Sequence, residues 1–174
     1  MRPASGLPSA LLVPVLAAEP LAAPLRPRWQ PPPEPGIPPH VTLLYPFVPA
    51  DRIDLTHLTR LGDLFGRQPP FDVRYERLAR FPGVLYLAPE PAEPFVSLTE
   101  RIVGLYPDYP PYAGQHAEIV PHLSLVQSPD ETVLAAAEEE AGAAPVAARA
   151  DEAWLMAPGR EGLWSRLARF GFES

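Results

Sequence analysis

The sequence predicts an α+β protein of two similar lobes, each a mainly antiparallel sheet with helices on its outer face. One observation is a phrase that occurs twice about half the chain apart: residues 39–44 read PHVTLL and residues 121–126 read PHLSLV. The other is a shared order of segments, in which a strand and a helix precede each histidine strand and a helix and a strand follow it. We therefore expect residues 1–174 to form one pseudo-symmetric two-lobed domain, with both histidine strands lining a central cleft.

Runs rich in β-branched and apolar residues predict the strands. They cover residues 9–15, 40–47, 71–80, 84–88, 119–126, 146–156 and 163–172. The turn signal at 81–83, Phe-Pro-Gly, joins two of these strands into a hairpin. The first 25 residues imitate a secretory signal, but two prolines interrupt the apolar run and the repeat requires residues 11–15 as a strand. We therefore interpret this segment as part of the fold.

Capping residues predict where helices begin and end. Asp54 is an N-cap for a helix that Gly66 ends. Residues 128–131, Ser-Pro-Asp-Glu, predict a capping box with proline at the first helical position, opening an alanine-rich helix that ends at Gly142. A third helix starts near Pro94. The proline cluster at 31–39 predicts a loop or polyproline segment that leads into the first histidine strand.

Composition limits the chemistry and the partners. All 14 basic residues are arginine, which excludes Schiff-base and P-loop lysine chemistry, and there is no cysteine for a thiol nucleophile, a zinc–cysteine site or a disulfide. A net charge of −7 argues against a broad grip on long nucleic acid, because that affinity comes from neutralising phosphates. No run approaches the ~20 apolar residues of a membrane span. We therefore expect a cytoplasmic monomer that acts on a small molecule or an RNA end.

Each copy of the repeated phrase places an imidazole and a hydroxyl on one face of a strand. His40 precedes Thr42 by two residues, as His122 precedes Ser124, and such side chains emerge about 6 to 7 Å apart. Histidine serves as general acid or base near neutral pH, and hydroxyls donate to the non-bridging oxygens of a phosphate. The pattern indicates a metal-independent site that breaks a phosphodiester, with two catalytic histidines and two phosphate-binding hydroxyls. Which histidine is the base stays open.

At these residues the chain resembles the two-histidine phosphoesterase superfamily, named for a repeated His-x-Thr/Ser motif, and within it the bacterial 2′-5′ RNA ligase-like or RNA cyclic phosphodiesterase group. The resemblance implies hydrolysis of 2′,3′-cyclic phosphate ends to a 2′-phosphate without a cofactor, and reversible, ATP-independent 2′-5′ joining. Many members place an arginine a few residues after the second histidine, where this chain has Gln127. Stabilisation of the transition state there is expected to be weaker or to come from another arginine.

Four residues are candidate substrate contacts. Gln127 offers a hydrogen bond, and Phe47, Phe81 and Tyr86 offer rings that stack on a base. Core packing is the simpler explanation for each of the three aromatic residues.

Two histidines lie outside the repeat. Both are interpreted as surface residues, His57 in the middle of a helix and His116 in a loop, and His116 is also a candidate for the rim of the cleft.

Two other classes of function stay open. His40, His122 and a carboxylate such as Glu118 would suit a metal site, although the hydroxyl two residues after each histidine has no purpose there. Alternatively, the fold is a binding module that holds a nucleotide or an RNA end without turnover.

Overall fold

The computed structural model describes residues 6–29, 35–143 and 145–173, and eight strands within them form one antiparallel sheet. The strands are β1 (Pro8–Pro14), β2 (His40–Pro49), β3 (Phe71–Phe81), β4 (Val84–Glu90), β5 (Leu123–Gln127), β6 (Val146–Ala150), β7 (Glu152–Pro158) and β8 (Trp164–Gly171). Their order across the sheet is β6-β3-β4-β5-β2-β1-β7-β8. The predicted α+β class and the antiparallel pairing are confirmed.

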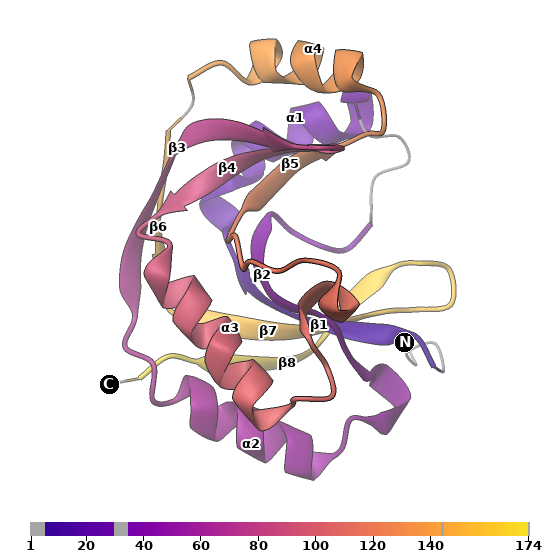
Figure 1. The fold of residues 1–174 in the computed structure, drawn as a ribbon, viewed down its shortest axis with the longest axis vertical. Coiled ribbons are helices and arrows are strands. Elements are labelled where there is room, and N and C mark those ends of the chain that lie inside the picture. Colours follow the sequence, from indigo (N-terminus) through magenta and orange to yellow (C-terminus); the bar gives the residue numbers. More distant parts are fainter. Residues whose placement is uncertain (1–5, 30–34, 144, 174) are drawn as a thin grey trace.

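The sheet has two four-stranded halves that meet at β5 and β2. The register across this seam is a single pair, Val41 with Leu123, whereas β1 pairs with β2 from Pro14 to Pro8. Figure 1 shows the two halves diverging from the seam, with β3, β4 and β5 in one and β1, β7 and β8 in the other. This is the predicted two-lobed architecture, with the two histidine motifs side by side at its centre.

Each lobe is built from both halves of the chain. The helices are α1 (Glu19–Trp29), α2 (Leu55–Phe65), α3 (Glu93–Leu105) and α4 (Glu131–Ala141). In the sheet, β3 pairs with β4 of the second half-chain, and β7 pairs with β1 of the first. The helices are exchanged too, since α1 packs on β5 and α4 while α3 packs on β2 and α2. Neither repeat therefore forms a lobe by itself.

Two of the predicted strands have other boundaries in the structure. The strand predicted over 119–126 begins only at Leu123, after Pro121, which has no N–H to donate to a ladder. The strand predicted over 146–156 is two strands, β6 and β7, separated at Asp151. Because β6 pairs with β3 and β7 with β1, the chain crosses from one lobe to the other there. Hydrophobic alternation does not reveal such a crossing.

The capping prediction for α2 is confirmed. The Asp54 carboxylate accepts from the backbone N–H of His57 (3.0 Å), and Gly66 ends the helix. His57 is the third residue of α2 rather than a mid-helix residue, and it is half-buried with its Nδ1 2.7 Å from Asp54 Oδ1. The mid-helix placement of His57 was therefore wrong, because this side chain lies in the first turn and completes the cap at the surface of the helix.

The capping box predicted over 128–131 does not form. Asp130 is the N-cap of α4 and accepts from the N–H of Thr132 (2.9 Å). The Glu131 carboxylate accepts from the N–H of Gly83 (3.3 Å) instead of folding back onto the cap. A hydrogen bond between residues 48 positions apart in the sequence thus replaces the predicted local bond of the capping box. The helix near Pro94 is confirmed as α3, with proline in its first turn.

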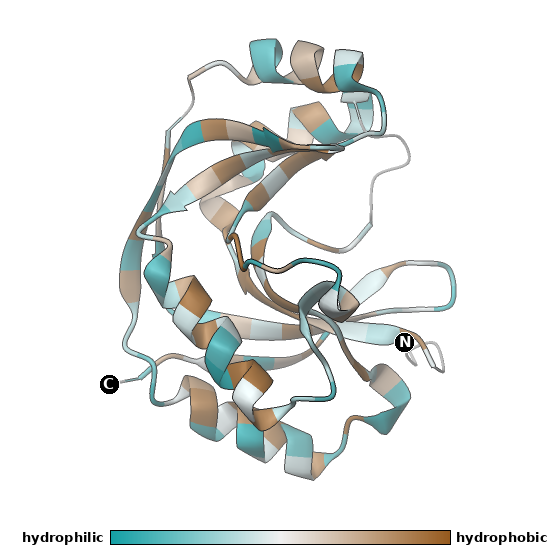
Figure 2. Cartoon of the chain, in the orientation of Figure 1, coloured by the Kyte–Doolittle hydropathy of each residue, from teal (hydrophilic) through white to brown (hydrophobic). Residues whose placement is uncertain are grey.

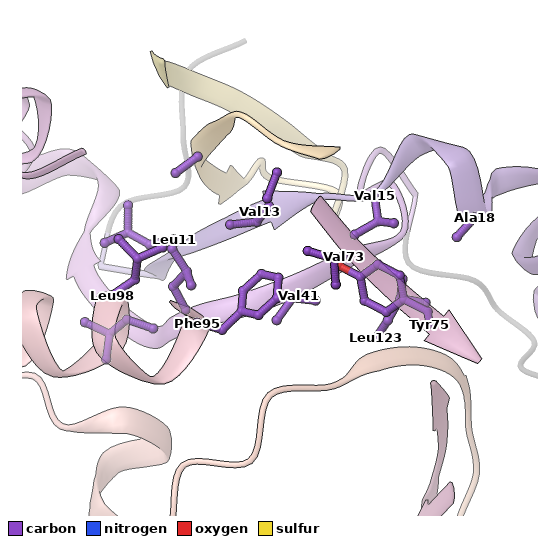
Figure 3. Packing of buried hydrophobic residues seen from close by; sticks show 14 of the residues in the cluster. Leu11, Val13, Val15, Ala18, Val41, Val73, Tyr75, Phe95, Leu98 and Leu123 are labelled. Atoms are coloured by element: carbon purple, nitrogen blue, oxygen red, sulfur yellow. The ribbon is translucent and has the colours of Figure 1, made fainter. Parts of the chain in front are cut away.

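The core lies between the sheet and its helices. Leu11 and Val13 lie on the same face of β1 and are almost fully buried. Figure 3 shows them in one cluster with Phe95 and Leu98 of α3. Polar and apolar segments alternate along α2 and α3 in Figure 2, as expected for helices with one face on a sheet. No helix that the structure describes combines the length and the hydrophobicity needed to cross a bilayer.

The segment before His40 is held in place by backbone hydrogen bonds. The predicted loop or polyproline segment at 31–39 lies outside the described residues up to 34. Beyond them, the Trp164 N–H donates to the Pro35 carbonyl (2.9 Å), and the Val15 N–H donates to the Pro39 carbonyl (2.7 Å). Gly36 has φ +85°, and a Cβ there would meet the Trp164 carbonyl oxygen at 2.1 Å, so only glycine fits. These contacts fix the approach of the chain to the first motif.

Candidate active site

A cavity of about 910 Å³ is lined by residues of both lobes. His40 and Thr42 line it from β2, and His122, Ser124 and Gln127 line it at β5. The sheet therefore brings together the two imidazoles and the two hydroxyls of the repeated phrase. The volume of the cavity is typical of a site for a small ligand.

The two imidazoles are held in the same way. The Nδ1–H of His40 donates to the Pro38 carbonyl at 2.7 Å, and the Nδ1–H of His122 donates to the Val120 carbonyl at 2.7 Å. In both cases the acceptor lies two residues before the histidine. A carbonyl oxygen only accepts, so this bond keeps the proton on Nδ1 and leaves the lone pair of a neutral ring on Nε2.

The surroundings of both histidines favour the neutral ring. The pKa of His40 is lowered to about 4: burial is the largest cause, the bond to the Pro38 carbonyl opposes it, and the positive charges of Arg26 and His122 lower it further. Burial lowers the pKa of His122 as well, against the opposing bond to the Val120 carbonyl. Both rings are therefore available as proton acceptors at neutral pH.

Arg26 lies in the last turn of α1 and lines the cavity. Its Nη2 donates to the Ser124 carbonyl (3.2 Å) and its Nη1 to the Ile37 carbonyl (3.4 Å). The guanidinium thus touches the chain beside each motif. No sequence pattern pointed to it, because α1 packs on β5 only in the folded protein and two prolines, Pro24 and Pro27, obscure the helix.

Aromatic rings line the cavity from both lobes. Phe81 at the end of β3 stacks on Tyr86, with ring centroids 4.4 Å apart, and each of the two rings forms an edge-to-face pair with the His122 ring, at centroid distances of 5.2 and 5.6 Å. On the other lobe, Tyr45 and Trp164 line the same cavity, with their ring centroids 6.4 Å apart. Tyr45 directly follows the first motif, which is a weak signal in the sequence, and no signal there marks Trp164.

The structure divides the four candidate substrate contacts. Gln127 and Phe81 line the cavity. Tyr86 is 7% exposed and lies behind Phe81 as its support. Phe47 is 1% exposed and packs in the core, with its ring centroid 4.9 Å from that of Tyr106. For Phe47 the structure therefore favours the packing interpretation over substrate contact, because its ring packs on Tyr106 and Tyr109 and does not line the cavity.

The segment that precedes the second motif covers part of the cavity. Tyr112, His116 and Glu118 all line it, and the His116 and Tyr112 rings meet edge to face at 5.4 Å. His116 thus lies at the cavity, as the rim interpretation expected. Tyr112 and Ala113 have φ of 51° and 54°, a left-handed conformation that costs non-glycine residues of order 1 kcal/mol or more. The left-handed pair forms a kink in the segment that lines the site.

The metal alternative finds no set of ligands. Glu118 does line the same cavity as His40 and His122. Within the described ranges, however, no three His, Cys, Asp or Glu side chains are grouped so that they could hold a metal ion. The arrangement is better suited to proton transfer between two imidazoles and a bound anion.

Comparison with known proteins agrees with this geometry. A model described as the 2′-5′ RNA ligase superfamily matches residues 13–162, which include both motifs and every strand of the sheet except β8 and most of β1. The chain belongs to the 2′-5′ RNA ligase superfamily. The resemblance drawn from the repeated phrase is therefore confirmed.

Solved structures show the fold of this superfamily. Apo LigT of E. coli is similar with a TM-score of 0.63 and 18% identity, over 98% of this chain and 100% of LigT. LigT complexed with 3′-AMP gives a TM-score of 0.62 and 18% identity, over 96% and 98%. TT0787 of Thermus thermophilus gives 0.57 and 19%, over 97% and 99%. No curated protein matches the sequence.

Proposed function

We propose that this member of the 2′-5′ RNA ligase superfamily hydrolyses 2′,3′-cyclic phosphodiesters, at an RNA end or in a small nucleotide, to a 2′-phosphate. One observation carries the proposal: two imidazoles in one cavity, each with its Nδ1–H fixed on the backbone carbonyl two residues earlier. Such a pair has two Nε2 atoms for proton transfer and needs no third side chain to orient them. The 3′-AMP bound in the LigT relative supports a nucleotide as the ligand class.

The surroundings of the two histidines support one division of the proton-transfer roles. Burial lowers the pKa of His40 to about 4 and the charge of Arg26 lowers it further, whereas burial alone lowers the pKa of His122, against the bond to the Val120 carbonyl. A pair with one proton therefore carries it on His122. His40 Nε2 takes a proton from water as the water oxygen attacks phosphorus, and His122 Nε2 gives its proton to the 3′ oxygen as the P–O3′ bond breaks.

The phosphate oxygens require donors in this reaction. Negative charge grows on the non-bridging oxygens as the fifth bond to phosphorus forms. Thr42 and Ser124 each stand two residues after a histidine and line the cavity, so their hydroxyls are the donors beside the two Nε2 atoms. The same scheme with a 5′-hydroxyl in place of water forms a 2′-5′ linkage without ATP.

Cyclic phosphate turnover in EDTA tests the proposal. Wild type, His40→Ala and His122→Ala would receive 2′,3′-cyclic nucleotides and a cyclic-phosphate-ended oligonucleotide. We expect wild type to form 2′-phosphates and each variant to lose about 10²- to 10⁴-fold in rate. His57→Ala is the matched control, since His57 lies on α2 outside the cavity.

Three results would contradict the proposal. Turnover of neither substrate by wild type, a near-full rate in either cavity variant, or a loss of activity in EDTA that added metal restores would each do so. Tight nucleotide binding without product, unchanged in His40→Ala, would establish the binding module instead.

A further inference from the structure

The structure assigns Arg26 as the cation that binds the phosphate group in this cavity, a role that rests on the proposed function. Among the described residues that line the cavity, Arg26 is the one arginine, and the chain has no lysine. It reaches the site from α1, not from the strand that carries the second motif. The polar residue that β5 itself contributes beyond Ser124 is Gln127, which brings no charge.

The position of Arg26 is fixed by two backbone acceptors. Its Nη2 donates to Ser124, two residues after the second histidine, and its Nη1 donates to Ile37, three residues before the first. Both acceptors are backbone carbonyl oxygens, which orient the planar guanidinium through its N–H groups. Because the two acceptors lie beside different motifs, the guanidinium is bonded near both of them at the cavity.

The charge of Arg26 is felt inside the site. It contributes to the lowered pKa of His40, together with burial and the second imidazole of His122. The other titratable groups that line the cavity from the neighbouring segment are Tyr112, His116 and Glu118. A cation near enough to act on the His40 ring is also near enough to act on an anion that this ring contacts.

A fixed guanidinium has a direct use in the reaction. The attack of water on a cyclic phosphate adds negative charge to the non-bridging oxygens, and a preorganised positive group stabilises that charge more than it stabilises the substrate. Arginine also matches phosphate oxygens in its planar geometry, which lysine does not. We therefore treat Arg26 as a residue that contacts the reacting group, alongside Thr42 and Ser124.

Arg28 provides a matched control on the same helix turn. It lies two residues after Arg26, and its Nη1 is 3.5 Å from Glu140 Oε1 on α4, with its side chain 65% exposed. Arg28 does not line the cavity. Arg28→Gln therefore removes the same charge from the same helix end without touching the site.

The first test is binding of inorganic phosphate, measured by calorimetry at fixed ionic strength. Arg26→Gln is expected to weaken phosphate affinity at least about tenfold, Arg26→Lys to fall between that variant and wild type, and Arg28→Gln to match wild type. In parallel, an NMR titration of the imidazoles is expected to show a higher pKa for His40 in Arg26→Gln but not in Arg28→Gln. A purely structural arginine would not produce this charge-specific pattern.

The second test is kinetic. On a 2′,3′-cyclic nucleotide, Arg26→Gln is expected to lower kcat by about 10²- to 10³-fold, with partial rescue by Arg26→Lys. Melting temperatures check folding, and Arg26→Lys carries the test if the glutamine variant does not fold. Folded variants that keep both phosphate affinity and the His40 titration would overturn the assignment.

The two proposals fail separately. If wild type turns over no cyclic phosphate while Arg26→Gln still loses phosphate affinity, the reaction is wrong and the cation assignment stands. If wild type is active and Arg26→Gln keeps its rate and affinity, the reverse holds.

Discussion

His40 and His122 belong to two copies of one phrase, yet the two sides of the cavity surround them differently. Both rings donate from Nδ1 to a carbonyl two residues earlier. His40 is the first residue of β2 and its pKa is affected by the Arg26 charge, whereas His122 precedes β5 and packs edge to face with Phe81 and Tyr86. The local sequence thus sets the orientation of the rings, and groups from distant segments set their proton affinity.

The unequal surroundings explain how a duplicated motif can perform two different steps. Acid and base chemistry needs one group that holds a proton and one that does not, and two identical environments would not choose between them. The environments of the two histidines are unequal because Arg26 acts on His40, whereas Phe81 and Tyr86 pack on His122. The following predictions test that division of roles, beginning with the largest effect.

A substrate whose leaving group needs no proton should separate the two histidines most widely. With bis(p-nitrophenyl) phosphate, the phenolate departs without an acid, so His122→Ala is expected to keep most of the wild-type rate. His40→Ala is expected to lose about 10²- to 10⁴-fold, because the attacking water still needs a base. Release of p-nitrophenolate is followed by absorbance. Equal losses in the two variants would remove the division of roles.

The two hydroxyls, unlike the two imidazoles, should contribute equally to kcat. Thr42→Val and Ser124→Ala are each expected to lower kcat on a cyclic nucleotide by about 10- to 100-fold, since a hydrogen bond to a charged group contributes ~1.5–3 kcal/mol. Steady-state kinetics measure this, with the exposed Thr59→Val on α2 as control. A variant with the kcat of that control would show that its hydroxyl serves the strand only.

The aromatic residues of the two lobes should differ in what they support. Trp164→Ala is expected to raise KM for a cyclic nucleotide roughly tenfold through lost stacking, and to leave ribose 2′,3′-cyclic phosphate, which has no base, unaffected. Phe81→Ala is expected to change both substrates, because its ring also packs on His122. An NMR titration of His122 provides the independent readout. Identical behaviour of the two variants would contradict the comparison.

The pH dependence of stability should show the smallest effect. The pKa of His40 is about 6.5 in the unfolded chain and about 4 in the folded protein. As the pH falls, the unfolded chain therefore binds the proton before the folded protein does. The stability that His40 contributes is therefore complete above about pH 6.5 and is lost as the pH falls toward 4. In urea unfolding, the free energy of unfolding of His40→Gln is expected to change less than that of wild type between about pH 7 and about pH 4.5. A variant as steep as wild type would show that His40 is not buried as a neutral ring.

Local patterns predicted most elements and failed where a distant partner decided the outcome. The Asp54 cap was predicted because its donor is three residues away. The capping box at 128–131 was not formed, because Glu131 accepts from Gly83 across the molecule. The strand over 146–156 was divided by a crossing between lobes that no window of sequence contains. The fold class was correct, whereas the exchange of strands and helices between lobes was not foreseen.

For the site, the sequence alone determined the pairing of His40 with Thr42 and of His122 with Ser124, because strand geometry fixes what lies two residues apart. Its repeat also indicated that the two pairs belong to one cleft. Only the tertiary structure decided that Arg26, Tyr45 and Trp164 join them, and that Phe47 does not. The physical reason is range: backbone periodicity acts over a few residues, whereas burial and electrostatic fields depend on which distant segments the fold brings together.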